Sequence, residues 1–305
     1  MKIGVIMGGI SSEREVSLKS GKEILDNMNK EKYESIVPIL INSKKDVIER
    51  LENIDFAFLA LHGKFGEDGS IQGILEGMNI PYSGCGILSS AVCMDKDLTK
   101  KIIKSASIPT APWVVIKSLS EIDYDKIEEI GYPVFIKPNN GGSSIATFFV
   151  KSSKEVESCV KEGLKYNNKI IVEKYIEGEE ITSFILNGEV FPTLQIKVKN
   201  GKFFDYSSKY DESGAEEIEV YLPDKIQEAV NKIAKQCFHE LNCSVYSRVD
   251  MILSEDIPYV LEVNTLPGMT STSLSPKSAK ARGIDFSQLL DKIIECSLIE
   301  RGLGI

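Results

Sequence analysis

The sequence has few of the residues on which zinc centres and disulfide scaffolds depend. Only two of its 305 residues are histidine, and its six cysteines include no CxxC pair. Imidazole and thiolate groups at short, regular spacing are the usual zinc ligands, so this composition disfavours a zinc site. The cysteines, expected to be reduced thiols in the core, lie far apart in the chain: Cys85, Cys93, Cys159, Cys237, Cys243 and Cys296.

Long apolar runs and an excess of basic residues are also missing. No stretch approaches the roughly 18 apolar residues of a membrane span, and the apolar run at the N-terminus lacks the features of a signal peptide. The 36 Lys and Arg against 45 Asp and Glu give a net charge of −9, which does not attract nucleic acid or an anionic membrane. We therefore expect a cytoplasmic protein with neither of these partners.

The overall composition is that of an ordinary globular protein. Hydrophobic residues make up 42% and charged residues 27% of a chain whose length suggests more than one domain. We expect a mixed α/β and α+β fold with units at residues 1–93, 94–176 and 177–305.

The first unit reads as a doubly wound, Rossmann-like parallel sheet. Three apolar runs alternate with helical segments, as in βαβ units: Ile3–Met7, Ile36–Ile41 and Phe56–Leu61. Gly8-Gly9 follow the first run, and Ser12–Glu15 predict a capping box at the start of the first helix. A nicotinamide site is not expected, because the GxGxxG pattern is absent and no acidic residue follows the second run.

The rest of the chain predicts two α+β units. A lysine-rich helix begins near Asp95, and the last two strands form a hairpin around Ser254–Asp256. The expected strands are Trp113–Ile116, Val134–Lys137, Lys169–Lys174, Ile181–Leu186, Glu189–Lys197, Lys202–Asp205 after an Asn200-Gly201 turn, Val245–Leu253 and Pro258–Val263. The expected helices are Lys154–Tyr166, Asp224–Leu241 and Phe286–Ile299.

The strongest chemical signal is an acidic group on this last hairpin. Glu262 and Asn264 are two residues apart and share one face of a strand, and Asp250 on the neighbouring strand can join them. Oxygen ligands without His or Cys suit Mg²⁺ or Mn²⁺. A solvated strand face is the alternative, but the apolar residues around Glu262 indicate a buried strand, where an unpaired carboxylate is costly.

Lysines on separate elements form a second signal. Lys137 ends an apolar strand and Lys174 follows another, which are unusual places for solvating charges. Together with Lys96, Lys209 and the glycine-rich segment at 141–144, they suggest a phosphate cradle that is not a Walker loop. Each lysine taken alone is equally explained as a surface charge.

Three further residues are single candidates. Arg248 shares a strand face with Asp250 and, with the Gly268 N–H, suits a developing oxyanion, although a structural ion pair is the alternative. Glu13 lies in a first helical turn, where a carboxylate also stabilises the helix dipole. His62 ends a predicted strand at the carboxyl edge of the first sheet, where α/β folds bind ligands.

Taken together, these motifs resemble the D-alanine–D-alanine ligase family of ATP-grasp enzymes. The resemblance covers essentially the whole chain and rests on the order and spacing of several short motifs. They are Gly8-Gly9 with Ser12–Ser17, Leu61–Gly63 with Gly66–Gly69, Met94–Lys96, Ile136–Pro138, Gly142–Ser144, Glu173-Lys174, Lys209-Tyr210, Arg248–Asp250 and Leu261–Thr270.

The resemblance implies a role for each matching residue. ATP is expected to contact Lys96, Lys137, Ser144, Glu173, Lys174, Ile176, Glu180 and Lys209. Two Mg²⁺ or Mn²⁺ ions are expected on Asp250, Glu262 and Asn264. The two D-alanines are expected to contact Glu13, His62, Arg248, Gly268, Ser273 and Leu274, with Glu13, Ser143 and Tyr210 linked by hydrogen bonds.

The implied activity is ATP-dependent ligation of two D-alanines through a D-alanyl phosphate, for peptidoglycan precursor synthesis, in a homodimer. Arg248 and Gly268 then stabilise the oxyanion of the second step, and residues 206–217 are the candidate lid. Two alternatives are a D-alanine–D-lactate ligase on the same fold, which Tyr210 disfavours, and a non-catalytic ATP-binding module. The chain departs from the family pattern at Ile145–Thr147 after the serine loop and at Ser247 and Val249 around the arginine.

Overall fold

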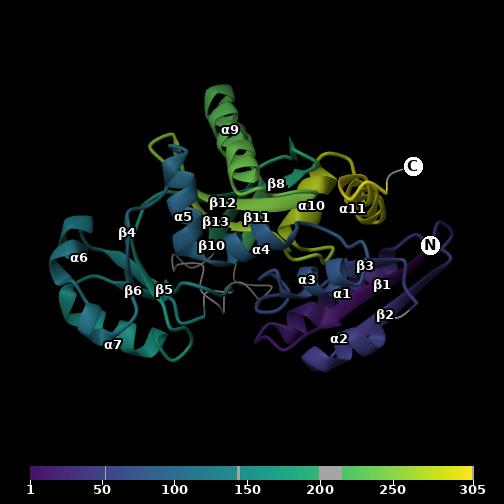
Figure 1. The fold of residues 1–305 in the computed structure, drawn as a ribbon. Coiled ribbons are helices and arrows are strands. Elements are labelled where there is room, and N and C mark those ends of the chain that lie inside the picture. The colour runs from purple at the N-terminus through teal and green to yellow at the C-terminus, as the bar shows by residue number, and fades with distance from the viewer. Residues whose placement is uncertain (52, 143–144, 199–214, 304–305) are drawn as a thin grey trace.

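The computed structural model describes residues 1–51, 53–142, 145–198 and 215–303, which form three β-sheets with helices packed against them (Figure 1). Two lobes, one around β1–β3 and one around β4–β7, lie on either side of a central sheet that contains β8, β12 and β13. No helix in these ranges is both long enough and apolar enough to cross a membrane.

The N-terminal sheet is parallel, as the sequence predicted, and its strand order is β2–β1–β3. Its strands are β1 (Lys2–Gly8), β2 (Ser35–Ile41) and β3 (Phe56–Leu59), and its helices are α1 (Arg14–Asn27), α2 (Lys44–Arg50) and α3 (Ser70–Gly77). Helix α4 (Ile87–Met94) follows and contacts α3, α5 (Lys96–Ser105) and β13. The strands are apolar because they are buried between elements, with all four residues of β3 inaccessible to solvent.

The capping box predicted at Ser12–Glu15 is wrong. Helix α1 begins at Arg14, and its N-cap, Glu13, makes no side-chain cap hydrogen bond. Ser11 orders this turn instead: its hydroxyl donates to the carbonyl of His62 at 2.7 Å and accepts the N–H of Glu13 at 3.2 Å. The Glu13 side chain is therefore not used to begin the helix.

The second sheet has the order β4–β7–β5–β6 and is antiparallel. Its strands are β4 (Trp113–Ile116), β5 (Val134–Pro138), β6 (Phe148–Val150) and β7 (Ile170–Lys174), with the short helix η1 (Leu119–Glu121) after β4. Its apolar face packs with helices α6 (Tyr124–Ile130) and α7 (Ser153–Gly163) into one core cluster. Because side chains alternate along a strand, Phe135 and Lys137 of β5 lie on the opposite face.

The third sheet has the order β11–β10–β8–β12–β13, with β9 paired to β8. Its strands are β8 (Glu179–Leu186), β9 (Glu189–Val190), β10 (Leu194–Val198), β11 (Ala215–Glu219), β12 (Tyr246–Ser254) and β13 (Ile257–Asn264). Helix α9 (Asp224–Glu240) forms an apolar cluster with one face of this sheet, and α5 (Lys96–Ser105) also contacts β13. The other face carries the predicted acidic residues.

The expected continuous strand Glu189–Lys197 is wrong in one respect, because β9 and β10 are separate. Pro192 lies between them and has no N–H to donate to a strand ladder, so the pairing stops there. The predicted Asn200-Gly201 turn and the strand Lys202–Asp205 lie outside the described residues. The hairpin β12–β13 is confirmed, with Ser254 paired to Ile257.

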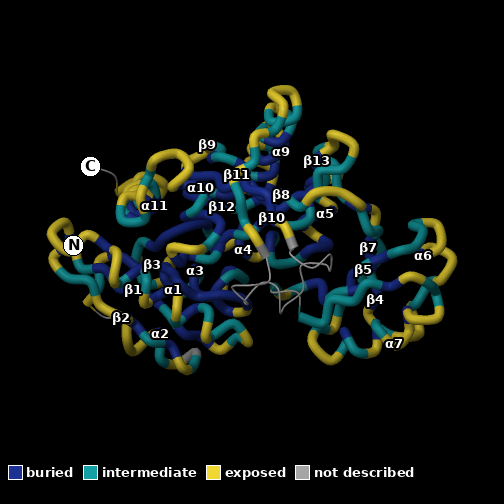
Figure 2. Tube along the Cα trace, turned by 180° about the vertical axis from the view of Figure 1, so that it is seen from behind, coloured by how far each residue is buried: buried dark blue, intermediate teal, exposed yellow. Residues whose placement is uncertain are grey.

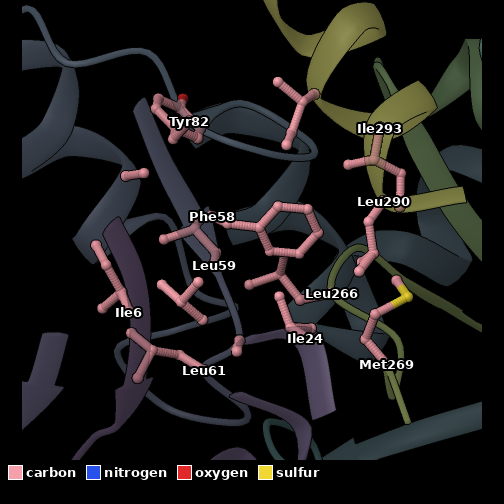
Figure 3. Close-up of a cluster of buried hydrophobic side chains, with 14 of the residues drawn as sticks. Ile6, Ile24, Phe58, Leu59, Leu61, Tyr82, Leu266, Met269, Leu290 and Ile293 are labelled. Carbon is pink, nitrogen blue, oxygen red and sulfur yellow. The ribbon is translucent and has the colours of Figure 1, made fainter. Parts of the chain in front are cut away.

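The core of the N-terminal lobe is built from both ends of the chain. Figure 3 shows Phe58 of the first sheet directed towards Leu290 and Ile293 of α11 (Phe286–Glu300), with Ile6 and Leu59 in the same cluster. Residues after β13 and the neighbouring helix α10 (Leu274–Ala281) join the same cluster. Figure 2 shows buried chain in the strands of each sheet and exposed chain along the outer helices.

Candidate active site

A cavity of about 1160 Å³ lies between the second and third sheets and extends to the loop before α1. This volume is large enough for a nucleotide together with a second small ligand. It brings together many of the residues that the sequence singled out: Glu13, Lys96, Lys137, Glu173, Lys174, Ile176, Glu180, Asp250 and Glu262. The serine loop and lid residues Ser143, Ser144, Lys209 and Tyr210 lie outside the described residues.

The register of the central sheet places the acidic residues side by side. Asp250 of β12 pairs with Glu262 of β13, and Arg248 pairs with Asn264 two residues along. On its other side, Asp250 pairs with Thr182 of β8. Residues in a cross-strand pair on one face have adjacent side chains, so the predicted cluster is present.

The Asp250 carboxylate is the centre of a hydrogen-bond network. Its Oδ1 accepts from Thr182 Oγ1 at 2.6 Å and from Arg248 Nε at 2.8 Å. Its Oδ2 accepts from Arg248 Nη2 at 2.7 Å and from Asn264 Nδ2 at 2.8 Å. Burial alone lowers the pKa of Arg248, but the charge of Asp250 outweighs this effect and raises it.

The ion pair that was the alternative interpretation of Arg248 is therefore present. Arg248 is not among the residues that line the cavity, and it reaches the cavity edge through Asp250, which does line it. Asn264 borders a small adjoining cavity together with Glu262 and Lys96.

Lys96 connects the acidic strand to the glycine-rich segment. Its Nζ lies 3.2 Å from Oε2 of Glu262 and donates to the carbonyl of Gly141 at 2.6 Å. The side chain is 9% exposed, so this cation is desolvated and close to both the acidic cluster and the cavity. An ammonium in this place can attract phosphate oxygens.

A second buried cluster holds Lys137, Glu173 and Lys100. Oε1 of Glu173 forms a short ion pair with Lys137, and Oε2 lies 3.1 Å from Nζ of Lys100. Burial by itself raises the pKa of Glu173, but the two ammonium groups outweigh it and lower that pKa to about 2. The carboxylate is thus ionised between two cations.

Aromatic and apolar side chains form one wall of the cavity. The rings of Phe135 and Phe149 have centroids 5.4 Å apart, and Tyr175 packs edge-on against both at 5.8 and 5.2 Å. Ile176 and Glu180 follow along the same wall. An apolar wall that ends in a carboxylate suits a planar heterocycle joined to a hydroxylated group.

Glu13 lies where the N-terminal lobe meets the glycine-rich segment. A Cβ atom at Gly63 would lie 2.5 Å from Oε2 of Glu13, and Gly63 has a φ of +68°, so only glycine fits there. A Cβ atom at Gly142 would lie 3.4 Å from both Glu13 oxygens. His62 is buried beside this contact, with Nε2 3.1 Å from Ser20 Oγ and Nδ1 3.5 Å from Glu67 Oε1.

Among the remaining candidates, Gly268, Ser273 and Leu274 do not line the main cavity, whereas Lys174 lines it but its ammonium group is bound elsewhere. Nζ of Lys174 donates to the carbonyls of Gly131 and Tyr132, away from Lys96 and Lys137. Ser273 and Leu274 begin α10, and the Ser273 hydroxyl accepts the N–H of Thr270 at 3.1 Å. A Cβ atom at Gly268 would lie 3.0 Å from this hydroxyl, so a larger residue there requires Ser273 to shift.

Sequence reasoning missed Lys100, Thr182 and the aromatic wall. Phe135 lies two residues before Lys137 on one strand, so the period of two could have placed both in the cavity. Lys100 lies four residues after Lys96 on α5, and the helical period could have placed both on one face. Thr182 had no such signal, because its pairing with Asp250 joins strands that are distant in sequence.

The sequence matches two family descriptions. "D-ala D-ala ligase N-terminus" matches residues 2–49 and 42–85, and "D-ala D-ala ligase C-terminus" matches residues 102–295. D-alanine–D-alanine ligase B of Clostridium perfringens is 58% identical over 98% of each chain. D-alanine–D-alanine ligase of Clostridium beijerinckii is 55% identical over 98% of this chain and 99% of that protein.

The fold also matches a solved structure. The crystal structure of D-alanine–D-alanine ligase from Bacillus anthracis complexed with ATP has a TM-score of 0.91, with 47% identity over 99% of each chain. The ATP-grasp fold expected from the sequence is thereby confirmed.

Proposed function

The chain belongs to the D-alanine–D-alanine ligase family, and from that premise we propose how its cavity joins two D-alanines. It is an ATP-dependent ligase that forms D-alanyl-D-alanine. The relatives give no support to the alternative of a D-alanine–D-lactate ligase. One observation supports the proposal best: a single cavity brings Lys96 and Lys137, the Asp250–Glu262 pair and Glu13 together.

ATP fits the cavity with its base and its phosphates at different places. We assign the base to the wall of Phe135, Phe149 and Tyr175, with Ile176 beside it and Glu180 for the ribose. The phosphates belong near Lys96 and Lys137, whose ammonium groups are already desolvated next to the acidic strand. Charge-assisted contacts of this kind are about twice as strong as neutral hydrogen bonds.

The donor set on β12 and β13 fits Mg²⁺ or Mn²⁺. Asp250, Glu262 and Asn264 offer carboxylate and amide oxygen atoms as ligands, and no imidazole or thiolate lies among them. When bound, two such ions neutralise phosphate oxygens and support an in-line displacement. In the structure, Lys96 and Arg248 provide the counter-charge for these carboxylates.

The chain's own residues then position the two amino acids. We assign the ammonium of the first D-alanine to Glu13, with its carboxylate directed towards the γ-phosphate, so that attack forms D-alanyl phosphate and releases ADP. The amine of the second D-alanine attacks the acyl carbon, and phosphate leaves. Arg248 and the Gly268 N–H are assigned to the oxyanion of this step, and Ser273 and Leu274 to the carboxylate of the second D-alanine.

Phosphate release with D-alanine, L-alanine and D-lactate tests the assignment. We expect release with D-alanine only, loss of activity on chelation of Mg²⁺, and D-alanyl-D-alanine as the product by mass spectrometry. Glu13→Gln is expected to raise the KM of D-alanine by about tenfold or more, because it removes the charge that faces the ammonium. Glu15→Gln, in the same helical turn, is the matched control. Equal effects of the two substitutions would refute the role of Glu13.

We also propose that the enzyme works in the cytoplasm as a homodimer and supplies dipeptide to peptidoglycan precursors. The resemblance to the family supports all three statements, and ATP is available in that compartment. Ile87 and Leu88 on α4 and Leu98 on α5 are exposed apolar side chains that a second copy can cover. Light scattering after gel filtration tests this, with a monomer mass contradicting the dimer.

A further inference from the structure

Lys100 is a buried cation that the assigned chemistry does not use. Its side chain is 1% exposed and is not among the residues that line the cavity. Nζ donates to Thr110 Oγ1 at 2.7 Å and lies 5.5 Å from the centroid of the Trp113 ring. Burying an ammonium group is costly unless it is paired with an opposite charge, so Lys100 requires a buried partner.

That partner is Glu173, which lies between two lysines. Glu173 is 2% exposed, and each of its carboxylate oxygens faces a different cation. One is Lys137, which lines the cavity, and the other is Lys100, which does not. The Thr110 hydroxyl also donates to the carbonyl of Val260 at 2.8 Å, which ties the Lys100 side to the strand of Glu262. Lys100 is thus held by α5, by residues 110–111 and by β7.

The arrangement creates a competition for Lys137. If Glu173 had one cation only, a phosphate that recruits Lys137 would leave a buried carboxylate unpaired, and removing one partner of a buried ion pair is strongly unfavourable. With Lys100 in place, Glu173 keeps a counter-charge when Lys137 turns towards a phosphate.

We propose that Lys100 is a positioning residue for nucleotide binding, which holds Glu173 in place and so frees Lys137 for the phosphates of ATP. This inference rests on the proposed function, because it assumes that Lys137 binds ATP. It concerns binding of the nucleotide and predicts no direct contact between Lys100 and any substrate.

The test is a double-mutant cycle on the Kd of the non-hydrolysable analogue β,γ-imido-ATP with Mg²⁺, measured by calorimetry. Lys100→Met is expected to raise this Kd about tenfold, equivalent to about 1.4 kcal/mol, and to raise the KM of ATP while the KM of D-alanine stays the same. In the Glu173→Gln background, the same substitution is expected to change the Kd by less than about twofold, because the competition is gone.

Lys104→Met is the matched control. Lys104 is on the same helix, and its Nζ lies 5.4 Å from the same Trp113 ring, so the variant loses one charge without removing the cation next to Glu173. We expect its Kd to stay within about twofold of that of the unaltered chain, because an exposed charge contributes little.

The outcomes distinguish the positioning role of Lys100 from ATP binding by the chain. Equal factors for Lys100→Met in both backgrounds, or an unchanged Kd with a lowered melting temperature, would overturn the positioning role. If Lys100→Met does not fold, the double variant with Glu173→Gln removes the buried Glu173–Lys100 pair as a whole and leaves only Lys137, whose side chain is 15% exposed. A loss of about tenfold relative to Glu173→Gln alone would then overturn the positioning role equally. No analogue binding by the unaltered chain would refute ATP binding itself.

Discussion

Asp250→Asn is expected to destabilise the chain, and to do so much more than Glu262→Gln on the paired strand. Asp250 accepts four hydrogen bonds, two of them from Arg248. An Asn amide has one oxygen and one NH2 group, and in either orientation the NH2 group faces an N–H of Arg248. The substitution therefore places donor against donor and leaves the guanidinium without its counter-charge.

The magnitude follows from the burial of this pair. The side chains of Arg248 and Asp250 are 17% and 9% exposed, and removing one partner of a buried ion pair costs about 3 to 5 kcal/mol. Because some solvent remains, we expect the lower end, about 3 kcal/mol. At about 2 °C per kcal/mol, the melting midpoint falls by about 6 °C. Glu262→Gln is expected to lower the free energy of unfolding by about 1 kcal/mol or less, because its partner Lys96 keeps a hydrogen bond to a backbone carbonyl.

Thermal melting followed by circular dichroism measures both variants. Adding Arg248→Met to Asp250→Asn is expected to recover more than half of the lost midpoint, because the unpaired cation is removed. Equal midpoints for Asp250→Asn and Glu262→Gln, or no recovery in the double variant, would refute the reasoning.

Three further outcomes are expected. Arg248→Lys is expected to lower turnover about a hundredfold with little change in the KM of ATP, since lysine keeps the charge without the planar fork; near-normal turnover in steady-state assays would make Arg248 purely structural. Glu262→Gln is expected to lose most turnover at saturating Mg²⁺ while its far-ultraviolet circular dichroism is unchanged, and full activity would remove Glu262 from the metal site. Burial raises the pKa of Asp97, but hydrogen bonds from Lys101, Lys169 and Trp113 outweigh it and lower that pKa from 3.8 to about 2. The stability that Asp97 contributes is thus present above pH 5 and is lost as pH falls towards 2. In urea unfolding at several pH values, the loss of unfolding free energy caused by Asp97→Asn is therefore expected to become smaller in acid. A loss of the same size at every pH would contradict this.

The acidic hairpin could be predicted because its signals are local. Two apolar runs flank a polar turn, and the period of two along a strand places Glu262 and Asn264 on one face. The turn alone would place Asp250 opposite Leu261, and a register shift between Asp250 and Met251, which the sequence pattern did not indicate, brings Asp250 opposite Glu262. The parallel first sheet followed from alternating strand and helix patterns.

Other features could not be predicted, because they depend on contacts between distant segments. The capping signal at Ser12–Glu15 is local, but Ser11 is anchored to His62, which the capping pattern does not include. The counter-charges for Glu173 come from two elements that precede it by tens of residues. Such pairings follow from the tertiary arrangement, and single-sequence patterns do not encode it.

The core that joins the two ends of the chain bears on how the protein is made. During translation the N-terminal sheet leaves the ribosome well before Leu290 and Ile293 of α11, which cover Phe58, have been synthesised. Until then, an apolar face of that sheet has no native cover, although the lobes between can already fold as units. The apolar face of the nascent N-terminal lobe therefore stays exposed until α11 has been synthesised, and exposed surface of this kind is what chaperones protect from aggregation.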